Sequence, residues 1–214
     1  MRINQFLAVA TGLSRREADK VVASGQVTIN GRLAELGTDV TSRDIVQLYG
    51  KKVTAKTPKT IMLNKPVGYV CSRQGQGNKT IYELLPLNLH YLKSIGRLDK
   101  DSSGLLLLTS DGSVAHTLTH PSFNKEKIYQ VKLNKPLQSH DQNAIREGIV
   151  LEDGPSKLSL SGADKSWTIK MSEGRNRQIR RTFAALGYTV VALHRTQFGP
   201  HKLGNLARGK YVAL

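Results

Sequence analysis

A run of four leucines, Leu105 to Leu108, limits what this chain can fold into more than any other feature of its sequence. Four consecutive apolar side chains need burial and are too few for an isolated helix, so residues 105–109 are predicted to form a buried strand. The run follows GRLDKDSSG, residues 96–104, which combines glycines with acidic and hydroxyl side chains. This segment has two interpretations. It is either the start of a calcium loop or a tight turn that holds Asp99 as a lone reactive carboxylate.

The calcium interpretation fails on spacing. An EF-hand loop needs oxygen ligands at alternate positions and a bidentate Glu at its twelfth position. Counting from Asp99, the twelfth residue is Ser110, and the four leucines occupy the seventh to tenth positions. Asp99 therefore belongs either to an enzyme site or to a simple turn, because an aspartate ahead of a strand commonly caps a turn. The rest of the chain must decide between these two.

The charge of the chain favours a nucleic acid as its partner. Of 214 residues, 32 are Lys or Arg and 16 are Asp or Glu, which gives a net charge of +16. Neutralising phosphates with such a surplus releases counterions, so a polyanion fits better than an anionic membrane or a surface kept basic for solubility. Residues 167–214 hold nine basic residues and one acidic residue, half of the surplus. Phosphate contacts are expected to concentrate there.

Other compositional features exclude several classes of protein. One cysteine, Cys71, permits no internal disulfide, and neither it nor the six histidines show metal-ligand spacing. We therefore expect no metal and no cofactor. No apolar run reaches the length of a membrane span, and FLAVA near the start is too short for a signal peptide. A cytoplasmic, monomeric protein is expected.

The pattern along the chain predicts two domains, residues 1–53 and 60–214. In the first, Ile3, Leu7 and Ala10 share one helical face, and Ser14 begins a second helix with a capping box. Strands at 27–29 and 44–48 complete a compact module. Its second helix carries candidate RNA-binding cations, namely Arg15, Arg16 and Lys20. The polar segment 51–59 is interpreted as a linker.

The second domain is predicted to be α+β with a mixed, mainly antiparallel sheet, because regular βαβ alternation is missing. The expected strands are 60–64, 105–109, 127–133, 167–171 and 188–193. The expected helices lie near 80–85, 112–118, 139–148 and 177–186.

Candidate chemistry falls in three places of this domain. The first is the turn with Arg97 and Asp99. The second is the strand in which Lys127 and Tyr129 point to the same face. The third is SEGRNRQIRRTFAALG, residues 172–187, a loop followed by a helix with an apolar stripe that includes Ile179. Its arginines are Arg175, Arg177, Arg180 and Arg181. Some are expected to bind phosphate, and one could neutralise a buried carboxylate.

Taken together, these segments resemble the ribosomal-RNA pseudouridine synthases of the RsuA type. The resemblance rests on LNKPVG at 63–68, GRLDKDSSGLLLLTSDG at 96–112, KIYQV at 127–131, EGRNRQIRRTFAALG at 173–187 and the tail TQFGPHKLGNLARGKYVAL. Residues 1–53 look like the small RNA-binding domain first known from ribosomal protein S4. Ser102 and Ser110 depart mildly from the pattern, where Thr and Asn are usual.

The resemblance implies roles for individual residues. Asp99 matches the essential aspartate, Tyr129 the tyrosine that stacks on the uracil, and Arg180 the arginine paired with that aspartate. Ile179 matches the apolar residue that packs beside the site. The remaining cations are expected to bind RNA: Arg15, Arg16, Lys20, Arg97, Lys127, Arg175, Arg177 and Arg181. Without the family pattern, Tyr129 could be a core residue and Arg180 a phosphate clamp.

The implied partner is ribosomal RNA or a pre-ribosomal particle. Leu151 to Pro155 look like a segment of the large-subunit enzymes, so 23S RNA is expected, with 16S RNA as the alternative. A second class of function stays open. This is an RNA-binding ribosome-assembly factor without chemistry, although such a binder has no need for Asp99 in a basic groove.

Overall fold

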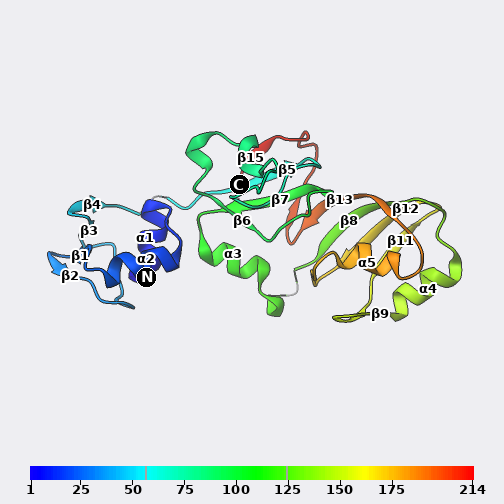
Figure 1. Cartoon of the computed structure of the whole chain (residues 1–214), viewed down its shortest axis with the longest axis horizontal. Coiled ribbons are helices and arrows are strands. Elements are labelled where there is room, and N and C mark those ends of the chain that lie inside the picture. Colours follow the sequence, from blue (N-terminus) through cyan, green and yellow to red (C-terminus); the bar gives the residue numbers. More distant parts are fainter. Residues whose placement is uncertain (56, 124) are drawn as a thin grey trace.

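The computed structural model describes residues 1–55, 57–123 and 125–214. The N-terminal module forms one end of the molecule in Figure 1. It contains α1 (Ile3–Thr11), α2 (Arg15–Ala23), β1 (Val27–Ile29), β2 (Arg32–Leu33), β3 (Val46–Leu48) and β4 (Lys51–Val53). The strands form a sheet in the order β2-β1-β3-β4. The predicted linker is therefore wrong for residues 51–53, which pair with β3 in strand β4.

The module has its own hydrophobic core, as its sequence pattern predicts. Ile3 and Leu7 of α1 are fully buried, and they pack in one cluster with Val22 of α2 and Val27 of β1. The predicted capping box is present, because the Ser14 side chain accepts from the Glu17 amide and the Glu17 side chain accepts from the Ser14 amide. This reciprocal pair satisfies two amides that would otherwise lack partners at the start of α2.

The rest of the described chain is built on one large sheet, in the order β11-β12-β8-β13-β7-β5-β15. Its strands are β5 (Thr60–Lys65), β7 (Ser103–Thr109), β8 (Lys127–Leu133), β11 (Ser159–Ala163), β12 (Ser166–Met171), β13 (Val190–Phe198) and β15 (Tyr211–Ala213). Short strands β6 (Lys93–Ile95) and β14 (His201–Lys202) pair with β7 and β13. Neighbouring strands are antiparallel except β7 and β13, which run parallel. The predicted mixed, mainly antiparallel sheet is confirmed.

The leucine run lies at the centre of this sheet. Every residue of β7 is buried. Leu106 and Leu108 belong to one hydrophobic core, and Leu105 and Leu107 belong to another on the opposite face. Successive side chains of a strand point to opposite faces, so a strand covered on both sides is apolar at every position.

The helices flank the sheet in Figure 1, with α3 near β6 and α5 and α4 near β8, β11 and β12. Their bounds are α3 (Gly112–Thr119), α4 (Ser139–Glu147) and α5 (Gln178–Ala184). A hairpin of β9 (Ile149–Leu151) and β10 (Gly154–Ser156) follows α4. Three 3-10 turns complete the described elements: η1 (Ile81–Leu84), η2 (Leu87–Leu89) and η3 (Pro121–Phe123). The helix expected near 80–85 is thus a 3-10 turn, and the one expected at 177–186 is shorter at both ends.

Candidate active site

Asp99 lies in the turn between β6 and β7, where backbone contacts fix its position. Gly96 enters the turn with φ of 68°, a left-handed conformation that suits glycine. The amide of Ser102 donates to the carbonyl of Asp99 at 3.1 Å. The Asp99 side chain is 34% exposed, and it lines a cavity with a volume of about 690 Å³.

A buried lysine that the sequence analysis missed holds this turn from below. Lys65, the last residue of β5, is 0% exposed. Its ammonium donates to the carbonyls of Ser102 at 2.7 Å, Asp99 at 3.0 Å and Pro66 at 3.1 Å. Burial lowers the pKa of Lys65. The signal in the sequence was a lysine two residues after the apolar segment IML, within the motif LNKPVG.

Gly104 lets the turn and its strand approach β13 closely. Its φ is 105°, and a Cβ built there would lie 2.2 Å from the carbonyl oxygen of Arg195. In the parallel ladder Gly104 is opposite Arg195, and Ser103 is opposite His194. Any larger residue at 104 would separate β7 from β13, and with it Asp99 from the other wall of the cavity.

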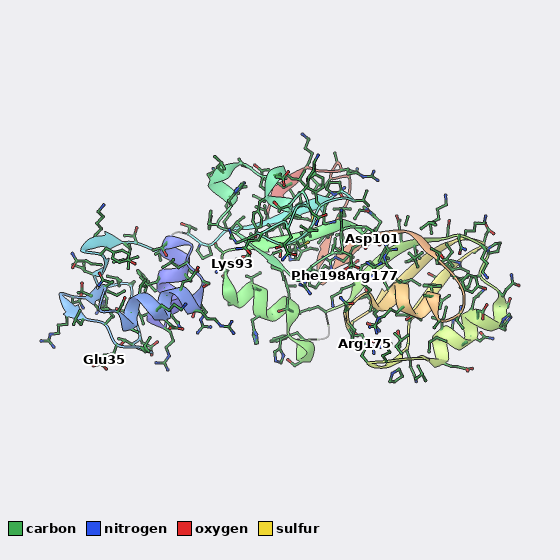
Figure 2. The ribbon with its side chains drawn as sticks, viewed as in Figure 1. Glu35, Lys93, Asp101, Arg175, Arg177 and Phe198 are labelled. Carbon is green, nitrogen blue, oxygen red and sulfur yellow. The ribbon has the colours of Figure 1, made fainter. Side chains whose placement is uncertain are left out.

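The arginine-rich loop forms that other wall, and Arg177 is the residue that reaches Asp99. Its guanidinium lies 3.4 Å from the Asp99 carboxylate and donates two hydrogen bonds of 3.1 Å to the carboxylate of Asp101. The Arg177 hydrogen bonds lower the pKa of Asp101, and burial opposes this effect. Figure 2 shows Arg177 and Asp101 next to each other near the middle of the molecule.

Arg180, expected to pair with Asp99, pairs with Asp101 instead. Its Nε is 3.3 Å from the Asp101 carboxylate. Its other nitrogens donate to the carbonyls of Val190 at 2.7 Å and Asp101 at 2.9 Å. Within the described residues, the arginine at ion-pair distance from Asp99 is Arg177, which is not part of the helix that follows it. With φ of 46° it is the left-handed N-cap of α5, and this turns its side chain toward Asp99.

Two of the expected RNA-binding arginines are held within the protein. Asp153, in the β9–β10 turn, accepts from Arg175 at 2.8 Å and from Arg181 at 2.9 and 2.7 Å. Arg175 also donates to the carbonyls of Gly154 and Pro155. These contacts attach the segments before and after Arg177 to the hairpin.

Tyr129 and Lys127 both line the cavity, which agrees with their predicted common face on β8. Tyr129 is 8% exposed. The Lys127 ammonium donates to the carbonyl of Ser172 at 3.0 Å and lies over the ring of Phe198. The guanidinium of Arg195 also lies over that ring, 4.8 Å from its centre. The cavity thus combines two carboxylates, Asp99 and Glu173, with two aromatic side chains and several cations.

The remaining predicted residues fall into two groups. Ile179, 4% exposed, lines the cavity, and so does the exposed Arg97, which makes no hydrogen bond or ion pair with the described residues. Arg15, Arg16 and Lys20 are exposed on α2 and do not line it. Within the described part of the chain, no group of three or more His, Cys, Asp or Glu side chains is placed to hold a metal ion. None of its helices is long and apolar enough to cross a membrane.

This geometry suits a nucleophilic reaction on a planar, anionic substrate. The Asp99 carboxylate faces the cavity beside Arg177, which holds its orientation without covering it. Tyr129, Met171 and Leu193 offer a largely apolar lining for a flat ring. Lys127, Arg97 and Arg195 supply positive charge around it.

Comparison with known proteins agrees with this chemistry. Residues 59–185 match the family model described as RNA pseudouridylate synthase, and residues 1–46 match the S4 domain. The chain is 41% identical to ribosomal small subunit pseudouridine synthase A of Pasteurella multocida, over 100% of this chain and 96% of the relative. It is 35% identical to ribosomal large subunit pseudouridine synthase B of Bacillus subtilis, over 97% and 89%. A crystal structure of a pseudouridylate synthase, 36% identical, superposes with a TM-score of 0.71 over 100% of this chain and 96% of that chain.

Proposed function

Because this chain belongs to the RNA pseudouridylate synthase family, we propose that it converts a specific uridine of ribosomal RNA into pseudouridine, with Asp99 as the nucleophile. The observation that carries the proposal is the convergence on one cavity of the Asp99 turn, the Arg177 loop and Tyr129. These segments are far apart in the sequence, and a simple turn-capping aspartate would need neither of the other two.

The reaction breaks the bond between C1′ and N1 of uridine, turns the base and joins C1′ to C5. It is an isomerisation without change of oxidation state, so one placed carboxylate is a sufficient covalent catalyst. Asp99 acts either by attack on C1′ or by assisting through the 2′ position. Tyr129 supports the detached uracil and assists loss of the C5 proton. Arg177 and Arg180, fixed by Asp101, hold the turn and its charge in place.

Ribosomal RNA is proposed from charge and from the relatives. The chain carries a net charge of +16, and the matched relatives are named for ribosomal subunits, some small and some large. The segment Leu151–Pro155, which favoured 23S RNA, forms the hairpin that binds Arg175 and Arg181. This structural role accounts for the segment whichever subunit is the substrate, so both RNAs enter the test.

The test is tritium release from 16S and 23S transcripts labelled at C5 of uridine. Wild type is expected to release tritium from one transcript, and Asp99→Asn to release none while its RNA affinity stays within a few fold. The matched control is Asp164→Asn, an exposed aspartate on a turn at the far end of β11. Asparagine tolerates the same positive φ, so this control should retain full activity.

Each failure has its own meaning. Normal turnover by Asp99→Asn would refute the nucleophile. Binding of both transcripts by wild type without any release would refute the substrate proposal and favour an RNA-binding assembly factor.

A further inference from the structure

Three exposed rings gather at one end of α3, outside the machinery described above. His116 and His120 lie one helical turn apart, with ring centres 4.8 Å from each other. Phe123 of η3 meets them edge-on, 5.9 Å from His116 and 6.2 Å from His120. Both histidines are exposed, and Phe123 is 44% exposed. These three residues are called the α3 ring cluster below.

The cluster does not serve the hydrophobic core. Leu118, Val114 and Ala115 fix α3 to the core beneath it, and none of the three rings is part of that packing. The His120 ring is oriented by a 2.8 Å hydrogen bond between its Nδ1 and the hydroxyl of Ser122. The ammonium of Lys125 lies 5.7 Å from the centre of the Phe123 ring. An oriented set of exposed rings with a cation beside it is a surface suited to flat, anionic ligands.

The cluster adjoins the rim of the active-site cavity. Leu118 and Thr119, between the two histidines, line that cavity opposite the arginine loop. The chain after η3 is attached to the β13–β14 turn by a 2.8 Å hydrogen bond from the Gly199 amide to the Glu126 carbonyl. Figure 1 shows α3 between the N-terminal module and α5. The rings therefore lie beside residues of the same helix that line the cavity.

We propose that the α3 ring cluster stacks an unpaired nucleotide next to the target uridine. This inference rests on the proposed function. A uridine can enter the cavity only after it leaves its helix, and its neighbour then loses a stacking partner. Aromatic side chains replace that partner in proteins that bind single-stranded RNA. Lys125 is placed to meet the phosphate of the stacked nucleotide.

The test separates stacking from mere apolar contact. Three variants of the full-length protein are compared on the transcript that wild type modifies: Phe123→Ala, Phe123→Leu and Phe123→Trp. Loss of a stacked base weakens binding by a factor of about 5 to 150. Because stacking acts on substrate and transition state alike, KM should rise by that factor in the Ala variant while kcat stays within about twofold. The Leu variant should be as weak as Ala, and the Trp variant should match wild type.

The matched control is Tyr211→Ala, which removes an aromatic of similar exposure, 38%, from strand β15 away from the cavity. It should leave KM unchanged. A direct probe is 2-aminopurine placed at either neighbour of the modified uridine in a short RNA, whose fluorescence should be quenched by wild type and not by Phe123→Ala.

The outcomes are distinguishable from failure of the proposed function. If wild type modifies the transcript and Phe123→Ala keeps the wild-type KM, only the stacking proposal falls. It also falls if Leu restores KM as well as Trp does. If wild type modifies no transcript, the proposed function itself fails, and the stacking proposal, which rests on it, falls with it.

Discussion

Lys65 is a fully buried lysine. Its three acceptors are backbone carbonyls, two of which belong to the turn that carries Asp99. Burial of its ammonium is unfavourable because the charge loses hydration, and the three hydrogen bonds offset this penalty. Removing it would leave the carbonyls of Ser102 and Pro66 without a donor, whereas the Asp99 carbonyl keeps the amide of Ser102.

Lys65→Met keeps the length of the side chain and removes the charge. We expect the free energy of unfolding to fall by about 2 kcal/mol or more, since each of the two carbonyls left unpaired costs about 1–3 kcal/mol. Urea denaturation measures this loss. Lys59→Met, at an exposed position shortly before β5, is the control and should change stability little. Equal midpoints for the two variants would contradict the role given to Lys65.

Single residues also show where sequence reasoning succeeds and where it stops. Asp99 and Tyr129 could be assigned to one site because both match the family pattern, whereas strand alternation placed only Lys127 and Tyr129 on the same face. The partner of Asp99 could not, because it depends on the left-handed backbone of Arg177. The sequence pattern predicted a helix that begins at residue 177, whereas α5 begins one residue later. Lys65 escaped because its acceptors are backbone atoms, which leave no trace in the side-chain pattern.

Among the elements, the β9–β10 hairpin has a role in the site although it does not line the cavity. Asp153 in its turn is bound by Arg175 before α5 and by Arg181 within it. Arg177 lies between these two anchors. The hairpin therefore determines where Arg177 stands relative to Asp99.

Asp153→Asn should lower turnover without unfolding the protein. An amide cannot match two guanidinium groups, so the loop loses its anchor, and a displacement of about 1 Å at a reacting centre costs up to about 100-fold. We expect kcat to fall between about 10-fold and 100-fold. Glu152→Gln, next to it and exposed, should behave as wild type. Tritium release gives kcat, and circular dichroism checks the fold. Unchanged kcat in Asp153→Asn would show that the loop holds without the hairpin.

The elements themselves were largely predictable. Every strand expected in the sheet exists, because the alternation of apolar residues and the leucine run report burial on one face or on both. The expected helix at 80–85 is a 3-10 turn, since a segment of six residues does not distinguish the two. Strand β13 runs to Phe198, beyond the expected 188–193. Its second half is polar, and an irregularity between Arg195 and Gln197 interrupts the alternation that would have signalled a strand.

At the scale of the whole molecule, carboxylates make stability sensitive to acid. Arginine, backbone and hydroxyl partners lower the pKa of Glu17, Asp44, Asp101, Asp111 and Asp153 in the folded chain. A lowered folded pKa means that the unfolded chain binds protons first as the pH falls. Stability from these groups is therefore complete above the usual carboxyl range and is lost as the pH drops through their folded pKa values.

We expect the thermal midpoint to fall slightly from pH 7 to about 5, because burial lowers the pKa of His194 and His201, and to fall steadily below about pH 4. Protonation also removes negative charge from a chain that already carries +16, which adds repulsion in the same direction. Melting curves followed by circular dichroism across this range measure the effect. A midpoint that stays constant down to pH 2.5 would contradict it.

The parallel pairing of β7 with β13 has a consequence for how the protein folds. Asp99 lies on one side of this seam, and Tyr129 and Arg177 lie on the other. This ladder pairs Ser103 with His194 and Gly104 with Arg195. Most of the residues that line the cavity lie between these paired residues in the sequence. Contacts between residues so distant along the chain form slowly, because closing the long intervening loop costs entropy before the contacts can stabilise it. A chain with both halves formed and the seam open has no active site, so catalytic activity reports completed folding rather than secondary structure.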